Sequence, residues 1–163
     1  MKFLTLLATL VLAQSAFALV PKTGTQTCSR LNPDSYRLAC YQTIEKAYID
    51  QWASGACDRF TNSAATLTCM KAIRNGRYYQ PIVVECDRYT NAHATVQCLN
   101  ASKNAWFNKY AIRACGRIHS SAHTTQCIYS IRNCRHITAD QIRRCDAMTT
   151  AQGTIDCFHH YCR

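Results

Sequence analysis

Several motifs that enzymes and metalloproteins commonly use are missing from this sequence. It contains no C-x-x-C motif, the usual spacing in zinc sites and in thiol–disulfide exchange centres. Its 9 acidic residues are scattered and form no carboxylate pair suited to acid–base catalysis. The six histidines show no regular ligand spacing, and Ser120 and Ser121 between His119 and His123 are weak support for nucleophilic catalysis. We therefore expect no catalytic residue, no metal site and no cofactor.

Long apolar runs are also absent, apart from one at the N-terminus. An apolar stretch over residues 3–13 follows Lys2, and the small-x-small sequence at 16–18 offers a cleavage site. This arrangement predicts a signal peptide over 1–18, with cleavage after Ala18, and an exported single domain over 19–163. The run is too short to cross a hydrocarbon core of roughly 30 Å. The periplasm and the extracellular medium are both open as destinations.

Acidic residues are scarce beside basic ones. The chain of 163 residues has 19 lysines and arginines against 9 aspartates and glutamates, a formal charge of +10. Such a charge favours contact with polyanions such as lipopolysaccharide, acidic glycans, nucleic acid or anionic lipid. The simpler interpretation, which we favour, is that the charge only keeps a secreted protein soluble.

Cysteine is abundant and periodic. The chain has 12 cysteines, an even number in an exported protein, which indicates a disulfide framework in an oxidising compartment. Ten of them form five copies of C-x11-C that recur every 29 or 30 residues. The opening cysteines are Cys28, Cys57, Cys86, Cys115 and Cys145, and the closing ones are Cys40, Cys69, Cys98, Cys127 and Cys157. A fixed period of this length is typical of a solenoid or a repeat array.

Two disulfide patterns suit this spacing. Cysteines can pair within a repeat, or the closing cysteine of one repeat can pair with the opening cysteine of the next, as in Cys40–Cys57. We favour pairing within repeats because it uses ten cysteines completely and leaves Cys134 and Cys162 to clamp the last repeat to the one before it. The predicted pairs are Cys28–Cys40, Cys57–Cys69, Cys86–Cys98, Cys115–Cys127, Cys145–Cys157 and Cys134–Cys162.

Each repeat reads as two short helices. Residues 61–63 offer an N-cap, apolar residues recur at helical spacing over 67–73, and Asn75-Gly76 supplies a stop. Pro81 then suits the start of the next helix, and Thr138 with Gln141 forms a capping-box pattern. The predicted fold is all-α: a disulfide-stapled α-solenoid of about five helical hairpins, or about ten helices, with a 29-residue period.

The repeat resembles a family of uncharacterised exported cysteine-rich proteins of predatory bacteria, built from short α-helical repeats. In that family a C-D-R start is followed about twelve residues later by C-L-x-A-I. The matching segments here are 57–59 with 69–73 and 86–88 with 98–99. A looser architectural likeness is to Sel1-like helical repeats stapled by cysteines. Ser29 and Gly116 replace the aspartate in two repeats, and Ala147 replaces the arginine in another.

Four arginines share one offset in the first four repeats and are the candidate binding residues: Arg30, Arg59, Arg88 and Arg117. In a regular stack they would form a row able to grip phosphates or carboxylates. The alternative, which we favour, is that they pair with aspartates such as Asp58 and Asp87 and join the repeats. Aromatic residues cluster after the second helix of several repeats, at 48, 52, 78–79, 106–107 and 110, and we expect them to form core between hairpins.

These observations favour recognition over catalysis. We expect a secreted, non-enzymatic binding or scaffold module whose rigid repeat surface binds a protein or a polyanionic macromolecule. The alternative is a small cationic secreted effector that acts on membranes or inhibits an enzyme. A membrane-active chain would need a helix with a broad exposed apolar face, and none remains once the stacking faces are assigned.

Overall fold

The chain folds into a row of five helical hairpins. The computed structural model describes residues 22–163, and within this range it contains ten α-helices and no strand. The hairpins, which we call repeats 1 to 5, pair α1 (Gly24–Ser29) with α2 (Asp34–Ile44), α3 (Gln51–Asp58) with α4 (Ser63–Ile73), α5 (Gln80–Asp87) with α6 (Ala92–Ser102), α7 (Lys109–Gly116) with α8 (Ser121–Ile131), and α9 (Ala139–Asp146) with α10 (Ala151–Tyr161). The predicted all-α solenoid of about five hairpins is confirmed. The predicted signal peptide, residues 1–18, lies outside the described residues.

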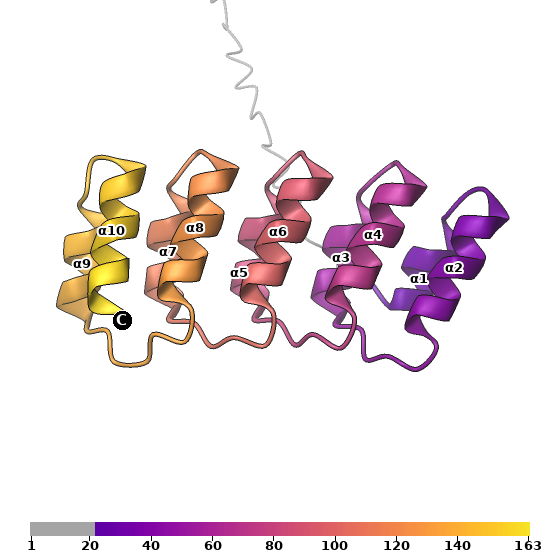
Figure 1. Cartoon of the computed structure of the whole chain (residues 1–163), viewed down its shortest axis with the longest axis horizontal. Coiled ribbons are helices and arrows are strands. Elements are labelled where there is room, and N and C mark those ends of the chain that lie inside the picture. Colours follow the sequence, from indigo (N-terminus) through magenta and orange to yellow (C-terminus); the bar gives the residue numbers. More distant parts are fainter. Residues whose placement is uncertain (1–21) are drawn as a thin grey trace, which may run out of the picture.

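The helices form two layers (Figure 1). The second helices of the hairpins pack side by side in the order α2, α4, α6, α8 and α10, and the first helices pack likewise from α1 to α9. The linkers that join one hairpin to the next run along one edge of the stack, and the turns within the hairpins lie along the opposite edge. None of the described helices has both the length and the apolar character that crossing a bilayer demands.

Side-chain caps set the helix starts. The side chains of Asp50, Asn62, Asn91 and Ser120 each accept a hydrogen bond from a backbone N–H in the first turn that follows. Such caps satisfy donors that have no partner inside the helix, and each is worth about 1 kcal/mol. The predicted capping box at Thr138 is present. Short helices of this kind depend on caps because they have few internal hydrogen bonds.

Disulfides occupy the centre of each hairpin. Five of them join the last turn of a first helix to the middle of its partner helix, at a sequence separation of 12 and Cα–Cα distances of 5.3 to 5.5 Å. In the chain-entropy model, closing a loop of this length stabilises the folded protein by about 3 kcal/mol. The sixth, Cys134–Cys162, joins the linker after α8 to the end of α10. All 12 cysteines are therefore paired. The five C-x11-C pairs close within repeats, and no closing cysteine pairs with the opening cysteine of the next repeat.

Apolar side chains between the two layers complete the core. Ile73, Leu99, Ile128 and Phe158 are fully buried, together with most of the disulfide cysteines. A hairpin of this size cannot bury enough apolar surface to be stable alone. Its stability therefore depends on its disulfide and on contacts with the neighbouring hairpins.

Candidate functional site

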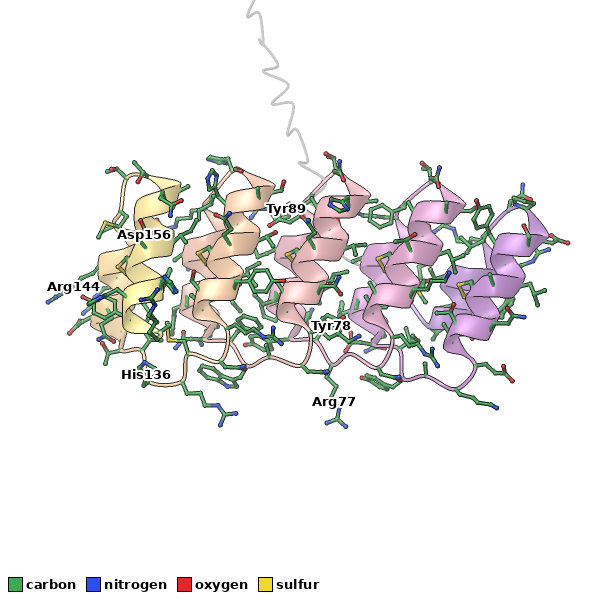
Figure 2. The ribbon with its side chains drawn as sticks, in the orientation of Figure 1. Arg77, Tyr78, Tyr89, His136, Arg144 and Asp156 are labelled. Atoms are coloured by element: carbon green, nitrogen blue, oxygen red, sulfur yellow. A yellow bond between two sulfur atoms is a disulfide. The ribbon has the colours of Figure 1, made fainter. Side chains whose placement is uncertain are left out.

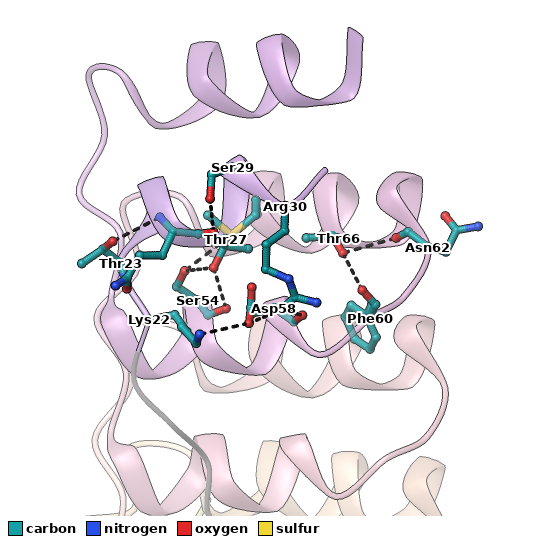
Figure 3. Close-up of polar contacts among 12 residues, drawn as sticks. Lys22, Thr23, Thr27, Ser29, Arg30, Ser54, Asp58, Phe60, Asn62 and Thr66 are labelled. Carbon is teal, nitrogen blue, oxygen red and sulfur yellow. Dashed lines mark hydrogen bonds and ion pairs between the residues drawn. The ribbon is translucent and has the colours of Figure 1, made fainter. Parts of the chain in front are cut away.

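The arginine row lies at the C-terminal ends of the first helices, and the structure places all four guanidinium groups in ion pairs. Arg30 pairs with Asp58 of the next repeat, as Figure 3 shows. Arg59 Nε lies 3.0 Å from Asp87 Oδ1, and Arg117 Nη1 lies 2.9 Å from Asp146 Oδ2. In each case the arginine of one repeat reaches the last residue of the following first helix. This is the alternative in which the arginines join the repeats.

Arg88 differs because its expected partner is missing. Gly116 occupies the aspartate position of repeat 4, and Arg88 pairs within its own repeat, with Nη1 2.9 Å from Glu85 Oε2. A Cβ added at Gly116 would lie 2.7 Å from the Glu85 carboxylate. Glu85 thus fills the space that an aspartate side chain takes in repeats 2, 3 and 5.

The carboxylates that pair with the arginine row are more buried than the arginines. The side chains of Asp58 and Asp87 are 9% and 14% exposed, against 54% and 36% for Arg30 and Arg59. Burial raises the pKa of Asp87, and the nearby Arg59 partly opposes that rise. A row of cations already balanced by buried carboxylates attracts a further anion less strongly than unpaired cations do.

A second row of aligned residues lies on the linkers, along the edge of the stack opposite the arginine row. We call the four linkers, residues 45–50, 74–79, 103–108 and 132–138, the linker edge. Asn75, Asn104 and Asn133 sit at equivalent positions with left-handed φ values of 57°, 56° and 59°. Asparagine tolerates this conformation better than other residues with a side chain.

Each of these asparagines binds the preceding linker through two hydrogen bonds. The Asn104 N–H donates to the Arg77 carbonyl oxygen at 2.9 Å, and the Arg77 N–H donates to Asn104 Oδ1 at 2.8 Å. Asn75 makes the same pair with Tyr48, and Asn133 with Trp106. This asparagine ladder fixes the backbone of adjacent linkers at one register, so side chains at equal offsets line up along the edge.

The aligned side chains alternate between aromatic and cationic. Tyr48, Arg77, Trp106 and Arg135 occupy the same offset in successive linkers, and all four are exposed. In Figure 2 the Arg77 side chain projects from the linker edge, away from the helices. The row therefore presents aromatic rings and guanidinium groups to solvent in turn.

A cleft of about 740 Å³ lies among these linkers. Its cations are Arg77, Lys109 and Arg135, and its rings come from residues 78, 79, 106, 107 and 110. No aspartate or glutamate of the described chain lines it, and none of its three cations pairs with an acidic residue in 22–163. Lys109 Nζ lies 4.9 Å from the centre of the Tyr110 ring, a cation–π contact. The cleft thus combines positive charge with aromatic surface.

Tyr78 forms part of the cleft wall. Burial raises its pKa, with a smaller contribution from Asp50, so its hydroxyl stays protonated at neutral pH. The ring packs over Gly76, where an added Cβ would lie 2.5 Å from a ring carbon. A side chain at position 76 would therefore displace the Tyr78 ring from its present place.

The expectation that the aromatic residues form core between hairpins is correct for only three of the seven. Phe107 is buried and Trp52 and Tyr78 are half-buried, as core residues should be. The other four, Tyr48, Tyr79, Trp106 and Tyr110, are between 42% and 57% exposed. Three of them lie in linkers and Tyr110 lies in the first turn of α7, where the neighbouring hairpins leave them exposed. Aligning the linkers at the 29-residue period would have shown the alternation.

Every cysteine is held in a disulfide, and no three His, Cys, Asp or Glu side chains of residues 22–163 are grouped to bind an ion. His136 Nε2 lies 2.8 Å from the Tyr161 carbonyl oxygen beside the Cys134–Cys162 disulfide, which supports a structural position for this histidine.

Fold and site together define a disulfide-stapled α-helical repeat protein with a cationic and aromatic linker edge. No protein-family model, curated protein or solved structure matches the chain.

Proposed function

We propose that this protein is a non-enzymatic binding module that holds a polyanionic macromolecule against its linker edge. The observation that carries the proposal is the cleft, which contains Arg77, Lys109 and Arg135 and no acidic side chain of the described chain. All four arginines of the row are engaged in ion pairs, three of them between repeats, whereas these three cations have no acidic partner within 22–163. A polyanion can therefore bind them without displacing an existing ion pair.

Rigidity supports the same function. The Cys134–Cys162 disulfide and the asparagine ladder hold the cleft-lining linkers before any ligand arrives. A preorganised surface loses less conformational freedom on binding, so more of the contact energy appears as affinity. Intramolecular disulfides also indicate an oxidising environment. We propose that the protein works in the periplasm or outside the cell, after cleavage following Ala18.

The test is a salt-titrated binding assay of the oxidised protein with lipopolysaccharide, an acidic glycan and nucleic acid. The test variant changes Arg77, Lys109 and Arg135 to glutamine together. The matched control removes the same charge by changing three other exposed cations outside the linker edge to glutamine, namely Lys71, Arg144 and Arg163. Figure 2 shows Arg144 on the last hairpin, away from Arg77.

We expect the test variant to bind about tenfold more weakly, because exposed ion pairs are worth roughly 0.2–1 kcal/mol each and 1.4 kcal/mol is tenfold. The control should stay within about twofold, and salt should weaken binding of the unchanged protein more steeply than that of the test variant. Equal losses in both variants would reduce the effect to net charge and contradict a site at the linker edge.

A further inference from the structure

The rings of the linker edge indicate more than attraction to negative charge. The exposed rings of the cleft, Tyr79, Trp106 and Tyr110, are amphipathic surfaces that suit a ligand with flat apolar faces of its own. Two kinds of polyanion have such faces. Sugars present C–H faces to aromatic rings, and single-stranded nucleic acids present bases.

The density of cations separates these two kinds. Successive linkers lie about one helix packing distance apart, roughly 8–10 Å. Arg77 and Arg135 are two linkers apart, and Lys109 follows the linker between them, so the cleft provides about one cation per repeat. A single nucleic acid strand carries a phosphate on every nucleotide, so even when it is extended it brings more than one negative charge to each repeat. A glycan with a carboxylate on every second sugar carries only one charge per disaccharide, a lower charge density that is closer to one cation per repeat.

The chemistry of the cations agrees with a carboxylate ligand. Arg77 and Arg135 present planar guanidinium groups, which bind carboxylates through two parallel hydrogen bonds. Both arginines line the same cleft as Trp106 and belong to linkers that contact the Trp106 linker through the asparagine ladder. A chain that crosses these linkers would meet a cation, a ring and a second cation in order.

We infer that the ligand of the linker edge is an extended acidic glycan with one carboxylate per disaccharide. Its sugar rings stack on Trp106 and its tyrosine neighbours, and its carboxylates pair with Arg77 and Arg135. This inference rests on the proposed function, because it names the ligand class of the same cleft.

The experiment compares three probes at physiological salt: a hyaluronan oligosaccharide, an uncharged chitin oligosaccharide, and an oligothymidylate matched to the hyaluronan in contour length. Each is titrated into the oxidised protein, into Trp106→Ala and into the Arg77→Gln, Lys109→Gln, Arg135→Gln variant. Tyr129→Ala is the matched control, since Tyr129 is an exposed aromatic residue on α8 and does not line the cleft. Circular dichroism and thermal unfolding check that each variant keeps its fold.

Hyaluronan should bind the unchanged protein about tenfold or more tightly than either other probe. Trp106→Ala should weaken this binding by about tenfold, and Tyr129→Ala by less than about twofold. Tighter binding of oligothymidylate, lost in both linker-edge variants, would overturn the glycan inference and leave the proposed function standing. Hyaluronan binding that survives Trp106→Ala would also overturn it, because the rings would then play no part. Binding of no probe, or binding unaffected by the triple variant, would overturn both.

Discussion

The asparagine ladder allows a sharp test of what holds the linker edge together. Asn104 combines a left-handed φ of 56° with two hydrogen bonds to the Arg77 backbone. Asn104→Ala removes the side-chain acceptor and leaves a Cβ in a conformation that alanine disfavours. The hydrogen bond is worth about 0.5–1.5 kcal/mol and the conformation about 1–2 kcal/mol. We expect the free energy of unfolding to fall by about 2–3 kcal/mol.

Two further changes at this position separate the contributions. Asn104→Gly also loses the acceptor but adopts a left-handed φ freely, so it should cost about 1 kcal/mol less than Asn104→Ala. Asn104→Asp keeps an acceptor oxygen for the Arg77 N–H and should cost least. Asn100→Ala, an exposed change within α6, is the control and should stay within about 0.5 kcal/mol.

Amide hydrogen exchange is the assay of choice because the repeats are stabilised locally. Exchange at the Arg77 N–H should accelerate in the alanine and glycine variants, since both lack the acceptor, and should stay slow in the control. Thermal unfolding should show a midpoint lower by about 5–10 °C in Asn104→Ala. Equal stability of the alanine and glycine variants would refute the role of the left-handed backbone, and unchanged exchange at Arg77 would refute the ladder.

Three other changes test the packing between repeats. Gly116→Asp should lower the free energy of unfolding by at least about 1 kcal/mol, because the new carboxylate meets Glu85, and adding Glu85→Ala should recover most of the loss in a double-mutant cycle measured by urea unfolding. The pKa of Asp87 is higher in the folded protein than in the unfolded chain. Its contribution to stability is therefore fully present when the pH is below about 3.9, the ordinary aspartate pKa, and is lost as the pH rises through the raised pKa. The free energy of unfolding of Asp87→Asn should therefore decrease less as the pH rises. Denaturation curves of both proteins over a pH series test this, and the same pH dependence in both would contradict it. Replacing Cys134 and Cys162 with serine removes a disulfide worth about 3–4 kcal/mol and should speed exchange in α9 and α10 while α3 to α6 stay protected; loosening spread over all repeats would argue against nearest-neighbour coupling.

Local rules read from the sequence account for most of the fold. The C-x11-C spacing places the two cysteines of a hairpin on facing helices, and the Asn, Ser and Thr caps mark where the helices begin. The 29-residue period then implies a stack, because a single hairpin cannot bury a core. These features depend on residues close together in the chain, so the sequence alone is enough to predict them.

Tertiary structure decided which cations are available to a ligand. Arg30 and Arg77 are both arginines in a periodic pattern, but the first faces the buried Asp58 of the next repeat, and the second projects from a linker with no acidic partner in the described chain. The difference depends on the distance and register between repeats. Hydrogen bonds such as those of Asn104 set that register, and they join residues 27 positions apart. Spacing along the chain shows that residues recur, whereas packing between repeats determines which of them are neutralised and which face solvent.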